Sequence, residues 1–200
     1  MSENKSDLNL IFSIPVWTAI ISNAEKVNAT MYEYIKALQT KNPTGKFKSN
    51  VRGWHSDDFD LQAKEVSFFL NSISQNLTEA FNNMGWDLKK NEVKITSMWS
   101  IINHKDASNS RHIHSNNYIS AAYYVKASQN SGNIVFYDPV SARVIRNPKI
   151  QNKNKLNSNV FSVEPKEGLL VLFPSYLDHS VDTNKSDDER MVISFNIDLI

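Results

Sequence analysis

The sequence predicts a mainly β protein, a sandwich or barrel with two helices packed against its outside. After residue 86 the apolar residues come in short β-rich runs separated by Asn, Gly, Pro and Ser, which is typical of a sandwich or barrel rather than of βαβ units. Before residue 86, two segments carry apolar residues at helical intervals. With 200 residues, no internal repeat and no break in composition, the chain is expected to form a single domain over residues 1–200.

The N-terminal part is expected to contain one strand and then the two helices. Leu10–Ile21 is rich in β-branched and aromatic residues and predicts a strand, and Pro15 within it predicts an edge position or a bend. The first helix is predicted by apolar residues at helical spacing over 27–38. The second is predicted by an apolar stripe over 66–84, which Gly85 ends.

The remaining chain is interpreted as a series of strands. Each run is short, apolar and bounded by turn residues, so it fits a strand better than a helix. The predicted strands are Val93–Asn103, Arg111–Ser115, Tyr118–Ala127, Asn133–Tyr137, Ala142–Ile145, Val160–Val163, Leu169–Phe173, Ser180–Val181 and Met191–Leu199.

The composition excludes several kinds of function. The chain has 22 basic and 21 acidic side chains, so it lacks the positive charge expected of a nucleic-acid-binding protein. It has no cysteine, which excludes disulfides, a thiol nucleophile, iron–sulfur clusters and cysteine zinc sites. No apolar run is long enough for a membrane span or resembles a signal peptide, so a cytoplasmic protein is expected.

Any metal site must therefore use His, Asp or Glu, and the chain has only five histidines. His112 and His114 are two residues apart, so they point to the same face if they lie on one strand and can converge on one ion. His179 follows a buried-looking strand and a Pro-Ser turn, and it supplies a third imidazole. One hairpin later, Arg190 supplies a cation that can bind a carboxylate.

Taken in order along the chain, these motifs resemble the Fe(II)- and 2-oxoglutarate-dependent oxygenase superfamily, and within it a branch of microbial and phage proteins. The resemblance runs from about Phe12 to the C-terminus. The residues that carry it are Arg52-Gly-Trp54-His-Ser56, Met98-Trp99, His112-x-His114, Ser120-Ala-Ala-Tyr123-Tyr124-Val, Gly132-Asn-Ile-Val-Phe136-x-Asp138-Pro139, Phe173-Pro-Ser175 with His179, and Glu189-Arg190 with Ser194-Phe-Asn196.

This resemblance implies a double-stranded β-helix (a cupin-like jelly roll) with the two N-terminal helices outside, Fe(II) and 2-oxoglutarate as cofactors, and a metal triad at its mouth. It places His112 at the first ligand position and His179 at the distal one. It also implies that Arg190 pairs with the distal carboxylate of 2-oxoglutarate, with help from Tyr124 and Ser194. The implied reaction uses O₂ to hydroxylate a small molecule or a peptide side chain, with release of succinate and CO₂, and needs no catalytic residue beyond the metal site.

The sequence departs from the superfamily at the carboxylate ligand, because His114 stands where Asp or Glu is usual. Three ligand sets are therefore open. A face of His112, His114 and His179 can bind iron, since imidazole suits Fe as well as Zn or Cu. Alternatively, His114 is the first ligand and Asn116 occupies the second position, or a more distant carboxylate, from Asp138 or Asp178, completes the site.

Two other functions fit the same residues. One is a cupin-like three-histidine dioxygenase that uses no 2-oxoglutarate, and the other is a non-catalytic jelly-roll binding module. Arg190 distinguishes the first from the oxygenase, since only a 2-oxoglutarate enzyme needs a carboxylate anchor there. His55, on a polar loop between the helices, is expected to structure that loop, and the alternative is that it lines a substrate entrance. His104 is expected to be exposed near the mouth of the site without binding metal.

Overall fold

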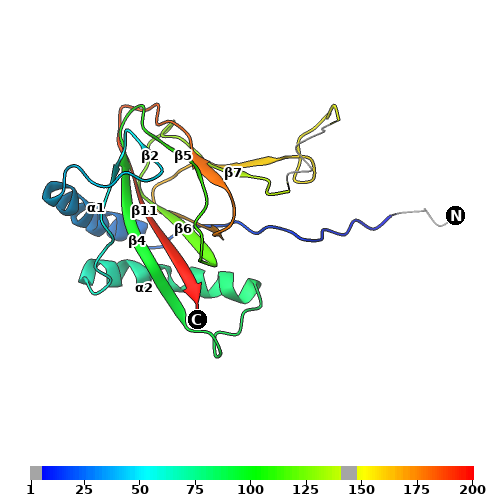
Figure 1. The fold of residues 1–200 in the computed structure, drawn as a ribbon, viewed down its shortest axis with the longest axis horizontal. Helices are drawn as coiled ribbons and strands as arrows, with labels where there is room; N and C mark the ends of the chain where they lie inside the picture. Colours follow the sequence, from blue (N-terminus) through cyan, green and yellow to red (C-terminus); the bar gives the residue numbers. More distant parts are fainter. Residues whose placement is uncertain (1–5, 141–147) are drawn as a thin grey trace.

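The computed structural model describes residues 6–140 and 148–200. A strand, a helix, two short strands and a second helix precede the remaining strands (Figure 1). The helices are α1 (Ala24–Lys41) and α2 (Lys64–Asn83). The strands are β1 (Trp17–Ile20), β2 (Asn50–Val51), β3 (Trp54–His55), β4 (Val93–Asn103), β5 (Ser108–His112), β6 (Ile119–Lys126), β7 (Ile134–Tyr137), β8 (Val160–Val163), β9 (Leu169–Pro174), β10 (His179–Val181) and β11 (Arg190–Leu199).

The strands form two antiparallel sheets, as the predicted jelly roll requires. One sheet has the order β1-β9-β6-β11-β4-β3 and the other β2-β5-β10-β7-β8. Side chains of both sheets share one apolar cluster, in which Phe173 of β9 meets Phe136 of β7 with ring centroids 4.9 Å apart. The predicted double-stranded β-helix with two helices on its outside is therefore confirmed.

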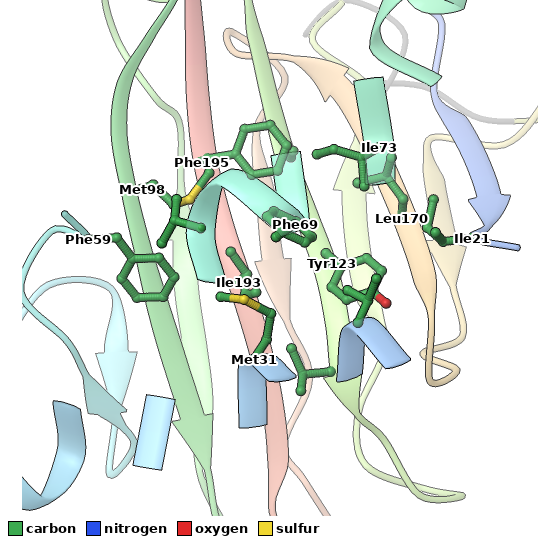
Figure 2. Packing of buried hydrophobic residues seen from close by; sticks show 14 of the residues in the cluster. Ile21, Met31, Phe59, Phe69, Ile73, Met98, Tyr123, Leu170, Ile193 and Phe195 are labelled. Carbon is green, nitrogen blue, oxygen red and sulfur yellow. The ribbon is translucent and has the colours of Figure 1, made fainter. Parts of the chain in front are cut away.

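The larger sheet separates the main core from the interior of the jelly roll. Successive side chains of a strand point to opposite faces. On β6 and β11, Tyr123, Ile193 and Phe195 belong to the core beneath the helices (Figure 2). The alternate residues Tyr124 and Ser194 line a pocket on the other face. This alternation allows one pair of strands to build both a core and a site.

Several boundaries differ from the sequence prediction. The N-terminal strand is confined to Trp17–Ile20, at the predicted edge position, and the chain before it extends away from the body of the molecule (Figure 1). The strand predicted over Ala142–Ile145 lies outside the described residues. β2 and β3 arise in the segment expected to be a loop, where each pairs with one longer strand over two residues.

The strand expected over Arg111–Ser115 lies earlier, and this shift bears on the site. β5 runs from Ser108 to His112, so His114 follows the strand rather than lying within it. The backbone N–H of His114 donates instead to the carbonyl of Ser175, 3.0 Å away, which ends the pairing with β10. Within the described part of the chain, neither helix is long and apolar enough to cross a membrane.

Replacing Phe69 by alanine is expected to lower the free energy of unfolding by about 3–5 kcal/mol, the usual cost of emptying a buried aromatic site. Phe69 is fully buried in α2 and its ring contacts those of Tyr123 and Phe195 (Figure 2). Urea unfolding measures the change. Phe68→Ala is the matched control, because Phe68 is only partly buried at the rim of the same core. Equal losses in the two variants would contradict this packing.

Candidate metal centre and cofactor pocket

Three histidines meet at one end of the smaller sheet. His112 ends β5, His179 begins β10, and the two residues are paired partners in the register of these strands. His114 joins them from the loop after β5. One ring nitrogen of each histidine lies within 4.8 Å of those of the other two, and no other such group of three metal-binding side chains occurs in residues 6–140 and 148–200.

Backbone carbonyls orient two of these rings. The Nδ1 of His112 lies 2.7 Å from the carbonyl of Ser110, and the Nδ1 of His179 lies 2.9 Å from the carbonyl of Leu177. A carbonyl only accepts hydrogen bonds, so each Nδ1 carries the proton and donates it. The lone pair is left on Nε2 of both rings, which is the arrangement by which proteins orient metal-binding histidines.

The surroundings of the histidines keep them neutral. Burial, together with the neighbouring imidazoles, lowers the pKa of His114 to about 3 and that of His179 to about 4. Burial also lowers the pKa of His112. Neutral imidazoles are the form that binds metal, so the pocket holds its three nitrogens ready at neutral pH.

The metal-free protein is therefore expected to lose stability in acid. Between pH 6.5, the ordinary histidine pKa, and about 4, the unfolded chain binds protons at His114 and His179 that the folded chain does not. Its free energy of unfolding should fall as the pH falls, by on the order of 2 kcal/mol for each of the two histidines at about pH 5. Urea unfolding at several pH values measures this slope. The double variant His114→Gln, His179→Gln should have a shallower slope, and an unchanged slope would contradict this cause.

A guanidinium is buried in the same pocket. Arg190, at the start of β11, is 1% exposed, and its Nη1 donates to the carbonyls of Ser131 at 2.6 Å and Gly132 at 2.8 Å. Arginine has five N–H donors, so those on Nε and Nη2 remain for another ligand. No acidic side chain of the described residues forms an ion pair with it. Burial lowers the pKa of Arg190, which reflects the cost of holding a cation here without an anion.

The other predicted cofactor-binding residues line this pocket, whose volume is about 670 Å³. Tyr124 and Ser194 lie on its wall together with Arg190 and the three histidines. Burial raises the pKa of Tyr124 to about 12, so its hydroxyl stays protonated and can donate a hydrogen bond. Apolar side chains, among them Ile134, Phe173 and Val192, cover much of the remaining wall.

The residues of the other two ligand sets lie apart from the histidine cluster. Asp178 forms an ion pair with Arg111, whose Nε is 2.5 Å from the carboxylate. Asp138 accepts a hydrogen bond from the backbone N–H of Val140, 2.9 Å away. Asn116 is exposed in the turn after His114, with a φ of 61°. None of these three candidate ligands lines the pocket.

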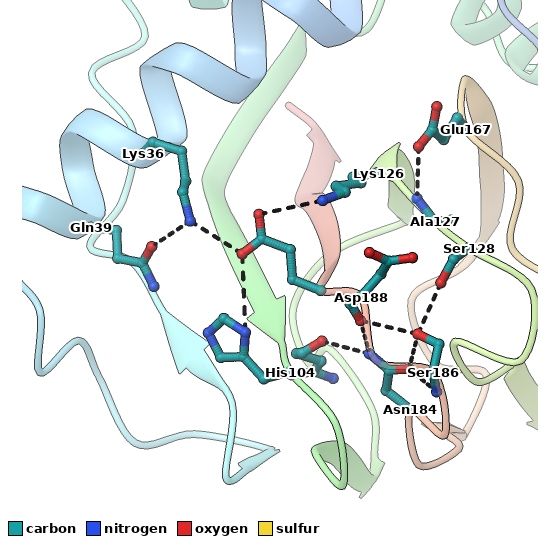
Figure 3. Close-up of polar contacts among 12 residues, drawn as sticks. Lys36, Gln39, His104, Lys126, Ala127, Ser128, Glu167, Asn184, Ser186 and Asp188 are labelled. Carbon is teal, nitrogen blue, oxygen red and sulfur yellow. Dashed lines mark hydrogen bonds and ion pairs between the residues drawn. The ribbon is translucent and has the colours of Figure 1, made fainter.

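The two remaining histidines take different places. His104 is 57% exposed on its side chain and faces the carboxylate of Glu189, which also pairs with Lys36 (Figure 3). It is not part of the pocket wall. His55, expected to structure a loop, is buried on β3 and lines the pocket. A strand of two residues leaves no periodicity in the sequence, so the sequence could not decide between a loop role for His55 and the alternative place at a substrate entrance.

The fold and the site together define a double-stranded β-helix protein with a histidine cluster and a buried arginine in one pocket. A sequence profile of the family described as "Putative 2OG-Fe(II) oxygenase" matches residues 97–196, which is half of the chain and includes every residue named here for the metal and the cofactor. The chain belongs to this family of 2OG-Fe(II) oxygenases, whose cofactors are Fe(II) and 2-oxoglutarate. No curated protein matches the chain by sequence.

Solved structures share the fold at low sequence identity. A prolyl-4-hydroxylase from Pseudomonas putida is 14% identical with a TM-score of 0.65, and the match covers 93% of both chains. HygX from Streptomyces hygroscopicus, with nickel, 2-oxoglutarate and hygromycin B bound, is 11% identical with a TM-score of 0.62 over 92% of this chain and 83% of that chain. A 2OG-Fe(II) oxygenase family oxidoreductase from Burkholderia pseudomallei is 14% identical with a TM-score of 0.56 over 88% of this chain and 91% of that chain.

Proposed function

We propose that this protein is a dioxygenase that binds Fe(II) through His112, His114 and His179 and hydroxylates an organic substrate at the expense of 2-oxoglutarate. Arg190, with Tyr124 and Ser194, binds the distal carboxylate of 2-oxoglutarate. The observation that supports this most strongly is that one pocket of about 670 Å³ holds two groups that fit the two cofactors. One is a cluster of three neutral imidazoles whose nitrogens converge, and the other is a buried guanidinium that forms no ion pair with an acidic side chain of the described residues.

The three histidines fit the metal of this family. Imidazole nitrogen is a ligand that suits iron, and the rings of His112 and His179 present free Nε2 atoms. Their set carries no charge, whereas the usual set of two histidines and one carboxylate carries one negative charge. The metal together with its three protein ligands therefore carries one more positive charge than with the usual set. This extra charge strengthens the attraction for the dianion 2-oxoglutarate.

The free edge of Arg190 fits the other end of 2-oxoglutarate. Its Nε and Nη2 form the fork that binds a carboxylate through two parallel hydrogen bonds. The hydroxyl of Tyr124 adds a neutral donor beside this fork, because its raised pKa keeps the proton in place. The bonds from Nη1 to Ser131 and Gly132 hold the guanidinium in position before the ligand arrives.

When bound, Fe(II) supplies the activation of O₂, and the net reaction converts 2-oxoglutarate to succinate and CO₂ as the substrate gains a hydroxyl group. The side chains of the pocket bind the oxo acid at both ends and thereby fix its orientation. Ile134, Phe173 and Val192 keep water away from this region, which strengthens the ionic contact with Arg190.

A three-histidine dioxygenase without 2-oxoglutarate remains the second candidate, because its ligand set matches the cluster. This second function gives Arg190 no anion to bind, and burying a guanidinium costs free energy unless an anion pairs with it. The oxygenase function explains both groups at once. A non-catalytic binding module explains the pocket but gives no reason for three converging imidazoles, two of which backbone carbonyls orient.

Succinate formation tests the proposed function. Protein loaded with Fe(II) is incubated with 2-oxoglutarate and O₂ without added substrate, and succinate is measured over time. The proposed enzyme should form succinate slowly, and the formation should require Fe(II), O₂ and the Arg190 side chain. Consumption of O₂ that is independent of 2-oxoglutarate would support the second candidate. No succinate and no binding of 2-oxoglutarate would refute the proposed function.

A further inference from the structure

His55 occupies a place in the pocket that the metal and 2-oxoglutarate do not explain. It is 8% exposed and lies opposite Ile101 in the pairing of β3 with β4. Its ring stacks on that of Trp99, with centroids 5.6 Å apart and planes 7° apart. The Trp99 ring also lies next to that of His114, with centroids 5.6 Å apart. His55 is thus one aromatic ring away from the candidate metal centre.

The hydrogen bond that His55 makes leaves one nitrogen as an acceptor. Its Nδ1 lies 2.7 Å from the carbonyl of Ser56, so Nδ1 carries the proton and the lone pair is on Nε2. Burial lowers the pKa of His55, which keeps the ring neutral at neutral pH. In the described part of the chain Nε2 has no hydrogen-bond partner, and it is not among the buried polar atoms that lack one. This nitrogen is therefore an accessible acceptor in the wall of the pocket.

The surrounding backbone holds this acceptor in place. The carbonyl of His55 accepts a hydrogen bond from the backbone N–H of Lys46 at 2.8 Å. The next residue, Ser56, bonds Ser100 twice, through its backbone N–H and through its hydroxyl, both at 2.9 Å. A Cβ at Gly45, where φ is +62°, would lie 2.5 Å from the His55 carbonyl, so this close approach needs glycine.

We propose that His55 is a substrate-binding residue whose Nε2 accepts a hydrogen bond from a hydroxyl or N–H group of the molecule that is oxidised. This inference rests on the proposed function, since it assigns the substrate of that same site. A histidine that only fills a core has its nitrogens bonded or sealed from solvent. His55 instead presents a fixed lone pair in the wall of the same pocket, one aromatic ring away from the candidate metal centre. The substrate class is a compound whose hydrogen-bond donor reaches Nε2 of His55 while the carbon that is hydroxylated lies at the metal centre.

Matched pairs of small probes test this assignment on protein loaded with Ni(II) and 2-oxoglutarate. The pairs are phenol with anisole and 2-pyrrolidinone with N-methyl-2-pyrrolidinone, in which a methyl group replaces the hydrogen of the donor. Ligand-observed NMR should show that at least one donor binds about tenfold more tightly than its methylated partner, as expected for one hydrogen bond. His55→Phe and His55→Leu should abolish this preference, and His55→Gln should restore it through the amide oxygen.

His104→Phe is the matched control, because it removes an exposed imidazole outside the pocket and should keep the preference. Equal binding within each pair, no binding of any donor, or a preference that survives in His55→Phe and His55→Leu would overturn the role of His55. Probes that bind to the metal rather than to His55 would keep their preference in both His55 variants. Metal content and 2-oxoglutarate binding of the wild-type protein are measured separately, and their absence would refute the proposed function instead.

Discussion

His179→Ala is expected to abolish stable metal binding. The purified variant should bind Fe(II) at least about 100-fold more weakly than the wild type, because it loses one of three ligands where the loss of an outer contact alone costs 10–100-fold. His179 is the most buried of the three histidines, and its ring contacts both of the others, with centroids 4.4 Å from His112 and 5.1 Å from His114. Iron content after anaerobic loading and desalting measures the effect.

His104→Ala serves as the control for this variant, because it removes an exposed imidazole that faces Glu189 rather than the pocket. It should retain full iron content. Circular dichroism of the metal-free His179→Ala protein shows whether the fold persists, and His179→Gln provides a less disruptive change. Full iron in both His179 variants would exclude this histidine as a ligand.

The same measurement decides among the three ligand sets. His114→Ala should lose iron as His179→Ala does, whereas Asn116→Ala, Asp138→Ala and Asp178→Ala should retain it. Asp178 pairs with Arg111 between the two strands that carry His112 and His179, so its replacement can weaken binding modestly through the position of these strands. Full iron in His114→Ala, together with loss in one of the other three variants, would identify a different ligand set.

Arg190→Ala is expected to weaken the binding of 2-oxoglutarate by about 100-fold or more, since removing one partner of a buried charge pair has a cost of this order. Arg190→Lys keeps the charge but loses the fork, so it should bind with about tenfold lower affinity than the wild type. Isothermal titration of metal-loaded protein with 2-oxoglutarate measures both. Metal content should stay at the wild-type level, because Arg190 is not a member of the histidine cluster.

Arg190→Ala also removes two hydrogen bonds to the carbonyls of Ser131 and Gly132, so its stability must be followed by thermal unfolding. Ser194→Ala and Tyr124→Phe remove only neutral groups and should each weaken binding by about tenfold or less. A folded Arg190→Ala variant with wild-type affinity for 2-oxoglutarate would contradict the proposed role of Arg190. It would favour the three-histidine dioxygenase that uses no oxo acid.

Long periodic segments made most of the fold predictable. The apolar stripe that contains Phe69 predicted α2, and the β-rich runs around Tyr123 and Ile193 predicted β6 and β11. The sequence could not predict β2 and β3, because two residues are too few for a pattern and their pairing depends on distant partners. The early start of β5 has the same cause, since its partner His179 lies far along the chain.

The histidines of the candidate metal centre could be predicted, because histidine is rare in this chain. A residue whose role depends only on its place in the folded sheet could not be predicted in the same way. A chain with five histidines and no cysteine offers few metal ligands, and His112, His114 and His179 meet as their order suggested. For His55 the sequence left two roles open, structuring a loop or lining a substrate entrance, and it favoured the first. Its place in the pocket arises from pairing with Ile101 and stacking on Trp99, both of which depend on the folded sheet.

The most direct test of the central claim is an anaerobic titration of Fe(II) into the protein with 2-oxoglutarate present, followed by visible absorption. If the histidine cluster and Arg190 bind the two cofactors in one pocket, a weak charge-transfer band should appear and saturate at one iron per chain. The band should be absent in His179→Ala and, at the same ligand concentration, in Arg190→Ala. A wild-type protein that shows no band at saturating Fe(II) and 2-oxoglutarate would contradict the proposed cofactor site.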